Sequence, residues 1–103
     1  EWMHEHEAPD AVVCSNDTMA IGCIDEARGT HGIDVPGQMS VVGFDGMYAA
    51  FWTGYELTTV RQPVNQMAKA AVDILMERID SPEAPPEKRV LAGSLIRGKS
   101  ARA

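Results

Sequence analysis

The stretch PDAVVCSNDTMAIGCIDEARG, residues 9–29, joins a short apolar run to a helical pattern. The run at residues 11–14 is continuous and apolar, which is typical of a strand covered on both faces in a parallel sheet. Side chains that can cap a helix follow at once, and apolar residues then recur at intervals of three and four. These residues are Met19, Ala20, Cys23, Ile24 and Ala27. We therefore expect a strand followed directly by a helix, which ends near Gly29 and Gly32.

Two further strand patterns extend this unit. The first covers residues 40–44, closes with Asp45 and Gly46, and completes a β-α-β unit. An aromatic-rich connection, residues 47–56, then leads to a third strand at residues 57–60. This order predicts an α/β fold with a mostly parallel sheet and flanking helices.

The remaining residues predict one more helix and two short strands. Pro63 stands near the start of the helix, which we expect to run to about Ile79. Its apolar face consists of Val64, Met67, Ala68, Ala71, Leu75 and Ile79. Residues 80–88 are rich in proline and acidic side chains and are expected to form a solvated loop. Strand candidates at residues 89–92 and 94–96 precede a polar tail.

Composition limits the class of protein. The chain has 103 residues, 45% of them hydrophobic, which suits one modest compact domain or a piece of one. Its formal net charge is −6 and its basic residues are scattered, so this segment is not expected to bind a phosphate backbone. No apolar stretch approaches the roughly 20 residues of a membrane helix. Cys14 and Cys23 are expected to be reduced, buried residues of a cytoplasmic protein.

Polar side chains follow each of the three predicted strands. Asn16 opens the first helix, Asp45 follows the second strand and Gln62 follows the third. Ligands of open α/β sheets collect at the carboxyl ends of strands. An amide can donate to one hydroxyl and accept from another, and a carboxylate can accept from two adjacent hydroxyls. A site for a sugar-like ligand is one interpretation; the other is that Asn16 is only a helix cap and Asp45 with Gly46 only a turn.

The connection at residues 47–56 carries four aromatic side chains, and three interpretations compete for them. The residues are Tyr48, Phe51, Trp52 and Tyr55. Aromatic side chains anchor protein interfaces, fill cores and stack on the apolar face of a sugar. We favour a subunit interface and keep ordinary core packing and direct ligand contact as alternatives.

Metal binding and catalysis are not expected. His4 and His6 lie among carboxylates but lack a third firm ligand, and His31 lies at a helix end. The sequence contains no nucleophile elbow, HExxH, Walker loop or GxGxxG, so no enzyme activity and no cofactor are predicted. Asp17, Asp25 and Glu26 are expected to be the charges of a helix start and a solvated face.

Three phrases carry a family resemblance. PDAVVCSNDTMAIG, DVPGQMSVVGFDG and ELTTVRQPV occur in this order at residues 9–22, 34–46 and 56–64. Together they resemble the C-terminal part of the effector-binding region of the lactose-repressor/galactose-repressor (LacI/GalR) family. The first two would also fit a periplasmic ribose-type binding protein, but LTTVRQP favours the repressors. One departure is Gly46, which replaces a second acid often found after GFD.

The resemblance implies a partial periplasmic-binding-protein-like type I fold. Residues 1–103 would be a C-terminal fragment of a sugar- or effector-binding domain, without the DNA-binding headpiece and the first subdomain. The helix at residues 63–79 would normally pack on that first subdomain, so its apolar stripe would lack its cover here and favour association.

The resemblance also implies a function and a set of site residues. The chain would be the effector-sensing and dimerisation portion of a cytoplasmic LacI-type repressor, and the alternative is a fragment of a periplasmic sugar-binding protein of a transporter. Asn16, Asp45, Gln62 and Trp52 would contact a small-molecule effector. The connection at residues 47–56 would lie at the contact of a homodimer. Operator DNA would be bound only through the absent headpiece, and no membrane partner is implied.

Overall fold

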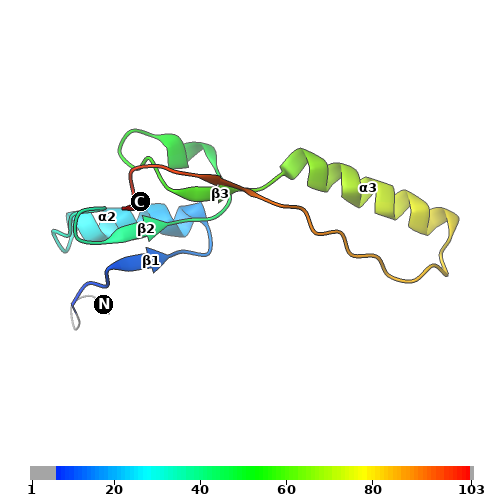
Figure 1. Ribbon diagram of the computed structural model, residues 1–103, viewed down its shortest axis with the longest axis horizontal. Helices are drawn as coiled ribbons and strands as arrows, with labels where there is room; N and C mark the ends of the chain where they lie inside the picture. The colour runs from blue at the N-terminus through cyan, green and yellow to red at the C-terminus, as the bar shows by residue number, and fades with distance from the viewer. Residues whose placement is uncertain (1–6, 103) are drawn as a thin grey trace. The chain divides into compact units, whose positions relative to one another are not determined.

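The computed structural model describes residues 7–102 and divides into two compact units. The first unit comprises Glu1–Arg61 with Leu95–Ala103, and the second comprises Gln62–Ser94. Figure 1 shows the elements of both units in chain order. None of the helices within residues 7–102 is long and apolar enough to cross a lipid bilayer.

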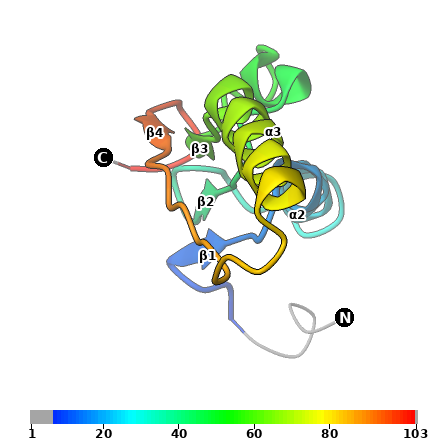
Figure 2. The ribbon, with the colours of Figure 1, turned by 90° about the vertical axis from the view of Figure 1, so that its right-hand side faces the viewer.

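The first unit is built on the expected β-α-β arrangement. β1 (Ala11–Val13) and β2 (Ser40–Val42) pair in parallel, and α2 (Asp17–Gly29) connects them and packs on β2 (Figure 2). The prediction of an α/β fold with parallel pairing is therefore confirmed. β1 is one residue shorter than the run predicted at residues 11–14, and β2 is two residues shorter than the run predicted at residues 40–44.

Two more strands complete this unit. β3 (Thr59–Arg61) continues the parallel arrangement through bridges from Val42 to Thr58 and from Asp45 to Arg61. β4 (Ser94–Ile96) pairs with β3. The strand predicted at residues 89–92 is wrong, because these residues form neither helix nor strand and are exposed.

The core of the first unit lies between α2 and the strands. Ala20, Ile24 and Ala27 lie on one side of α2 and are fully buried. Two residues of the predicted stripe are not buried with them, because Met19 is 56% exposed and Cys23 is only half-buried. Successive residues of a helix are rotated by about 100°, so positions 19 and 23 fall on the edges of the buried face. The remaining core residues are Cys14, Val35, Met39, Val41, Ala50 and Leu57.

The predicted polar tail is an integral part of the first unit. Ser100 is fully buried, and its hydroxyl donates to the Val41 carbonyl at 2.6 Å and accepts from the Thr58 N–H at 2.8 Å. The Val41 N–H in turn donates to the Ser100 carbonyl at 2.8 Å. The Arg102 guanidinium donates to the carbonyls of Gly37 and Asp10. The tail thus satisfies backbone groups of β2 that would otherwise be unpaired.

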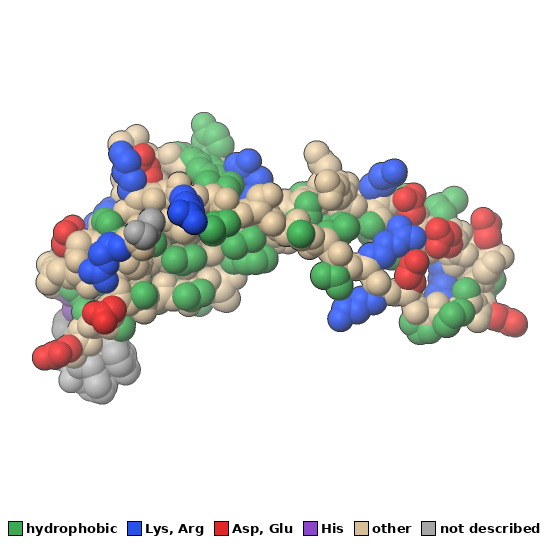
Figure 3. Space-filling model, viewed as in Figure 1, with side chains coloured by type: hydrophobic (Ala, Val, Ile, Leu, Met, Phe, Trp, Pro, Cys, Tyr) green, Lys and Arg blue, Asp and Glu red, His purple; other side chains and the backbone are tan. Residues whose placement is uncertain are grey.

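The second unit consists of α3 and the segment that follows it. α3 (Val64–Asp80) runs one residue beyond its predicted end and has no buried residue. Val64, Leu75 and Ile79, three members of the predicted apolar stripe, are each about 60% exposed. Hydrophobic side chains are interspersed with charged ones on the face of this unit that Figure 3 shows. Residues 81–88 are exposed and contain no helix or strand.

Candidate functional site

Parallel pairing places the carboxyl ends of β1, β2 and β3 at one edge of the first unit. Asn16 lies there as the N-cap of α2, with extended backbone angles. Its Oδ1 accepts a hydrogen bond of 2.8 Å from the Met19 N–H, so the side chain is a cap. This bond uses the amide oxygen and leaves the two donors of the amide nitrogen for another partner.

Asp45 lies at the same edge, three residues after the end of β2. Asp45 and Gly46 together are called the corner after β2. The Asp45 N–H donates to the Val60 carbonyl at 2.9 Å, and the φ of Asp45, 136°, is rare for any residue with a Cβ atom. Such strained positions persist only where the surrounding structure holds them, and they cluster at ligand sites. The half-buried Asp45 side chain is therefore fixed at the end of β2 by its backbone.

Gly46 completes this corner and is required by its geometry. Its φ is +74°, and a Cβ atom at this position would lie 2.9 Å from both Cα and Cβ of Arg61. The second acid that often follows GFD in the family would therefore force Arg61 to move. Gly46, which stands where the family often has a second acid, thus allows the corner to pack closely against β3.

Asp17 is the buried polar residue that holds this edge together. Its Oδ2 accepts from the N–H groups of Gly46 and Met47 at 2.8 and 2.9 Å, and its Oδ1 accepts from the Thr59 hydroxyl at 2.6 Å. One carboxylate thereby joins the start of α2, the corner after β2 and β3. Since Asp17 follows Asn16 and Gly46 follows Asp45, these bonds also bring the Asn16 and Asp45 positions together.

Sequence reasoning missed this role of Asp17, because it treated the residue only as a charge of the helix start. The residue does lie in the first turn of α2, but its side chain is fully buried. One signal was available: residue 17 lies three positions before Ala20 and seven before Ile24, so it continues the buried stripe of α2. A carboxylate on such a stripe requires donors from other elements.

Gln62, the third predicted ligand residue, is the first residue of the second unit. It follows β3 directly and is half-buried, and its backbone carbonyl accepts from the Val64 N–H at 2.9 Å. The edge that the first unit presents is therefore formed by Asn16 and Asp45, with Asp17 beneath them.

The aromatic connection divides into exposed and anchoring residues. Tyr48 is 84% exposed and Trp52 55%, and η1 (Tyr48–Phe51), a short 3-10 helix, carries the first of them. Phe51 is also exposed, and the Arg61 guanidinium lies 5.2 Å from the centroid of its ring. Tyr55 instead packs against the core. Three aromatic side chains thus share the surface of one short segment.

Two contacts hold the end of this connection on α2. The Tyr55 hydroxyl donates to Asp25 Oδ2 at 3.1 Å, and this hydrogen bond raises the pKa of Tyr55, with a smaller contribution from desolvation. The Arg28 guanidinium donates to the carbonyls of Gly54 and Val35. Asp25 is therefore a partner of the connection rather than only a solvated charge.

The remaining candidate groups lie away from this edge. Burial raises the pKa of the Cys14 thiol, and Cys23 adds to this effect. His31 Nε2 lies 3.5 Å from Glu26 Oε1. Among residues 7–102 no three side chains of the metal-binding types form a cluster, while His4 and His6 lie outside the described residues.

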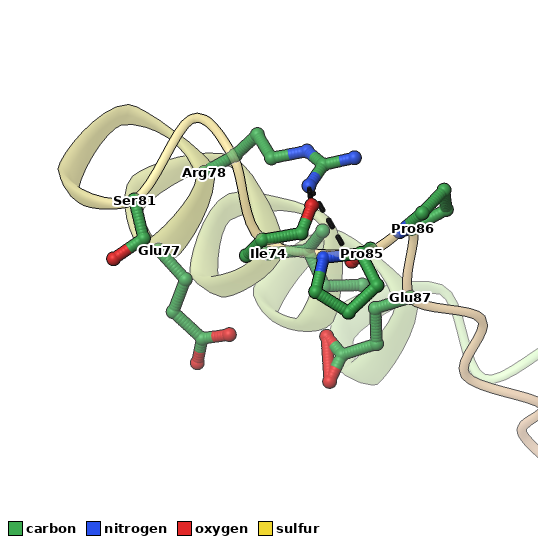
Figure 4. Close-up of a pocket in the computed structure, with 8 residues that line it drawn as sticks. Ile74, Glu77, Arg78, Ser81, Pro85, Pro86 and Glu87 are labelled. Carbon is green, nitrogen blue, oxygen red and sulfur yellow. Dashed lines mark hydrogen bonds between the residues drawn. The ribbon is translucent and has the colours of Figure 1, made fainter.

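A cavity of about 480 Å³ belongs to the second unit (Figure 4). It lies between the last turns of α3 and the proline-rich segment, where the Arg78 guanidinium donates to the carbonyls of Ala84 and Pro85. Its lining includes Ile74, Glu77 and Glu87. None of the predicted ligand residues lines this cavity.

Comparison with known proteins identifies the family. The family model for the periplasmic binding protein-like domain matches residues 1–101. The chain belongs to this periplasmic binding protein-like domain family. The HTH-type transcriptional regulator MalR of Streptomyces coelicolor is 47% identical over 94 residues, which are 90% of this chain and 27% of MalR. The chain thus spans about a quarter of the length of this curated relative.

Solved structures agree with this assignment. A LacI-type transcription regulator from Bifidobacterium animalis subsp. lactis is 33% identical, with a TM-score of 0.86 over 98% of this chain and 36% of that chain. A LacI family transcriptional regulator from Lactobacillus casei with bound sucrose is 35% identical, with a TM-score of 0.73 over 90% of this chain and 34% of that chain. The resemblance to LacI-type regulators and the partial periplasmic-binding-protein-like fold are confirmed.

Proposed function

We propose that this chain is the effector-sensing and dimerisation portion of a bacterial LacI-type transcriptional repressor that responds to a sugar or a similar small polar ligand. The observation that carries the proposal is the polar edge at Asn16 and Asp45, held by the buried Asp17 carboxylate. Relatives of the chain are transcriptional regulators, which supports a role in sensing rather than in transport or catalysis. A periplasmic transport protein is therefore not favoured.

Each ligand residue has a defined chemical role in this proposal. The Asp45 carboxylate accepts hydrogen bonds from two adjacent ligand hydroxyls, and its strained backbone keeps it in place before the ligand arrives. The Asn16 amide nitrogen donates to a ligand oxygen, and the N-terminus of α2 adds a favourable dipole. Gln62 supplies a second amide, and an apolar ring face supplied to the ligand by Trp52 is the alternative to a contact of that side chain with a partner copy. The Lactobacillus casei regulator with bound sucrose supports a sugar as the ligand class.

The second half of the proposal concerns the aromatic connection. Tyr48, Phe51 and Trp52 are exposed on one short segment, and exposed aromatic groups of this kind are typical of protein interfaces. We assign this surface to a second copy of the chain, so that Tyr48, Phe51 and Trp52 contact the partner while Tyr55 anchors the segment. Tyr55 itself packs against the core, so we do not assign it to the interface.

The proposed regulation depends on both the ligand edge at Asn16 and Asp45 and the aromatic surface. An effector that binds one arrangement of the subdomains more tightly than another shifts their populations, and a dimer passes this preference to paired DNA-binding headpieces. In this proposal the full-length protein acts in the cytoplasm, binds operator DNA through a headpiece outside this chain and needs no catalytic residue or cofactor.

Calorimetric titration of the full-length protein with a panel of sugars that includes sucrose, maltose, cellobiose and ribose tests the ligand site. Once a sugar binds, Asp45→Asn should weaken its binding at least tenfold, since a carboxylate with two ligand hydrogen bonds loses charge-assisted bonding. Asp80→Asn, the same change at an exposed site of α3, should leave binding unchanged. Equal losses in both variants would refute the assignment of Asp45, and a secretory leader upstream in the gene would refute the regulator.

A further inference from the structure

Residues 45–61 form a loop that leaves the sheet at Asp45 and returns to the same place. The two ends are joined by a parallel bridge between Asp45 and Arg61 and by the hydrogen bond from Asp45 N–H to the Val60 carbonyl. Halfway along, the Leu57 N–H donates to the Ala50 carbonyl at 2.7 Å, which ties η1 to the returning strand. The base of this loop is the proposed ligand corner, and its outer part carries the proposed partner surface.

Arg61 contacts both parts of the loop. Its backbone and Cβ lie against Gly46, where even a Cβ atom on the glycine would approach to 2.9 Å. Its guanidinium lies over the ring of Phe51 at 5.2 Å from the centroid. A planar guanidinium is suited to such stacking, which is attractive electrostatically and restricts both side chains. One residue thereby joins the ligand corner and the aromatic surface by direct contact.

We infer that Arg61 is a positioning residue that couples the Asp45–Gly46 corner to the aromatic surface at Phe51. This inference rests on the proposed function for its biological meaning. A ligand that forms hydrogen bonds with the Asp45 carboxylate moves the corner against Arg61, because Gly46 is closely packed against the Arg61 backbone. The guanidinium transmits this movement to the Phe51 ring. Because coupling is reciprocal, association of two copies at the aromatic surface also changes the conformation of the corner.

The test measures amide hydrogen exchange of the full-length protein at Gly46 and Met47, without any sugar. Both N–H groups donate to Asp17, so their exchange reports opening of the corner. Phe51→Leu removes the ring and keeps an apolar side chain, and it should speed this exchange about two- to five-fold, the range that an exposed cation–π contact supports. Phe51→Tyr keeps the ring and should restore the slow exchange.

Trp52→Leu is the matched control, because it removes an exposed aromatic group from the same surface. Exchange is compared at a protein concentration at which every variant is monomeric, so that lost association does not contribute, and there Trp52→Leu should leave exchange at Gly46 and Met47 unchanged. Arg61→Gln provides an independent second variant that removes the cation and should speed exchange to the same extent as Phe51→Leu.

Unchanged exchange in both Phe51→Leu and Arg61→Gln overturns the coupling, and so does an equal increase in Trp52→Leu. If Phe51→Leu does not fold, Arg61→Gln decides alone. These readouts involve no ligand, so they are distinguishable from a failure of the proposed function, which would show as absent sugar binding in the calorimetric titration.

Discussion

The hydroxyl of Thr59 donates to Oδ1 of Asp17 at 2.6 Å, which joins the first turn of α2 to β3 across 42 positions of the chain. Both residues are fully buried. The other oxygen of the same carboxylate holds the corner after β2. The position of the proposed ligand residues therefore depends on a side chain that lies beneath them.

Replacing Asp17 with Ala should destabilise the first unit by about 3 kcal/mol, because three donors lose their acceptor in a buried setting. Urea unfolding of wild type and variant, followed by far-UV circular dichroism, measures the difference. Asp80→Ala at the exposed end of α3 is the control and should change stability by less than about 0.5 kcal/mol. A loss no larger than that of the control would contradict the structural role of Asp17.

Gly46→Ala and Gly22→Ala should change stability in opposite directions. At Gly46 a methyl group meets Arg61 and a positive φ, and the expected cost is about 1–3 kcal/mol. At Gly22, within α2, it meets open space, and the helix should gain about 0.5–1 kcal/mol. Thermal unfolding of both variants measures these changes. A neutral Gly46→Ala would show that the corner is not closely packed.

Tyr55 should ionise above the usual pH for tyrosine, because the neutral hydroxyl donates to Asp25 and burial adds to the effect on its pKa. The folded state then favours the protonated phenol. This stabilisation is fully present below the unfolded pKa of about 10 and is lost as the pH rises from there through the folded pKa. The difference in phenolate absorbance between wild type and Tyr55→Phe isolates this group. Asp25→Asn should move its titration to lower pH, and an unshifted titration would exclude the hydrogen bond in solution.

Ser100→Ala should cost about 1–2 kcal/mol, because the Thr58 N–H loses its acceptor and the Val41 carbonyl loses one donor. Chemical denaturation compares it with Ser94→Ala, an exposed serine that should have little effect. Equal stability of the two variants would mean that residues 98–102 are not part of the folded unit.

The β-α-β unit could be predicted because its signals are local. A continuous apolar run, a capping residue and a three- and four-residue period lie within residues 9–29, and Asn16 forms the expected cap. The three polar residues at strand ends could be identified for the same reason, since each lies within two residues of the end of a predicted strand. Their roles toward an effector stay a proposal.

The missed features depend on contacts between distant parts of the chain. Burial of Asp17 requires donors from residues 46, 47 and 59, and burial of Ser100 requires β2 and β3. Neither set is visible in a local pattern. The opposite error occurred at residues 89–92, where an apolar composition was not matched by a partner strand, and Val90 is 81% exposed.

The contacts of Arg102 have a consequence for biosynthesis. This residue donates to the carbonyl of Asp10, 92 positions earlier, just before β1 begins. Ser100 supplies the neighbouring bonds of β2. A nascent chain on the ribosome can form α2 as soon as that helix emerges, but β2 keeps unpaired backbone groups until residues 98–102 have left the exit tunnel. Formation of the complete first unit therefore waits for the synthesis of the whole intervening second unit, and translational pauses within residues 62–94 would prolong the time during which the edge of β2 is open to wrong partners.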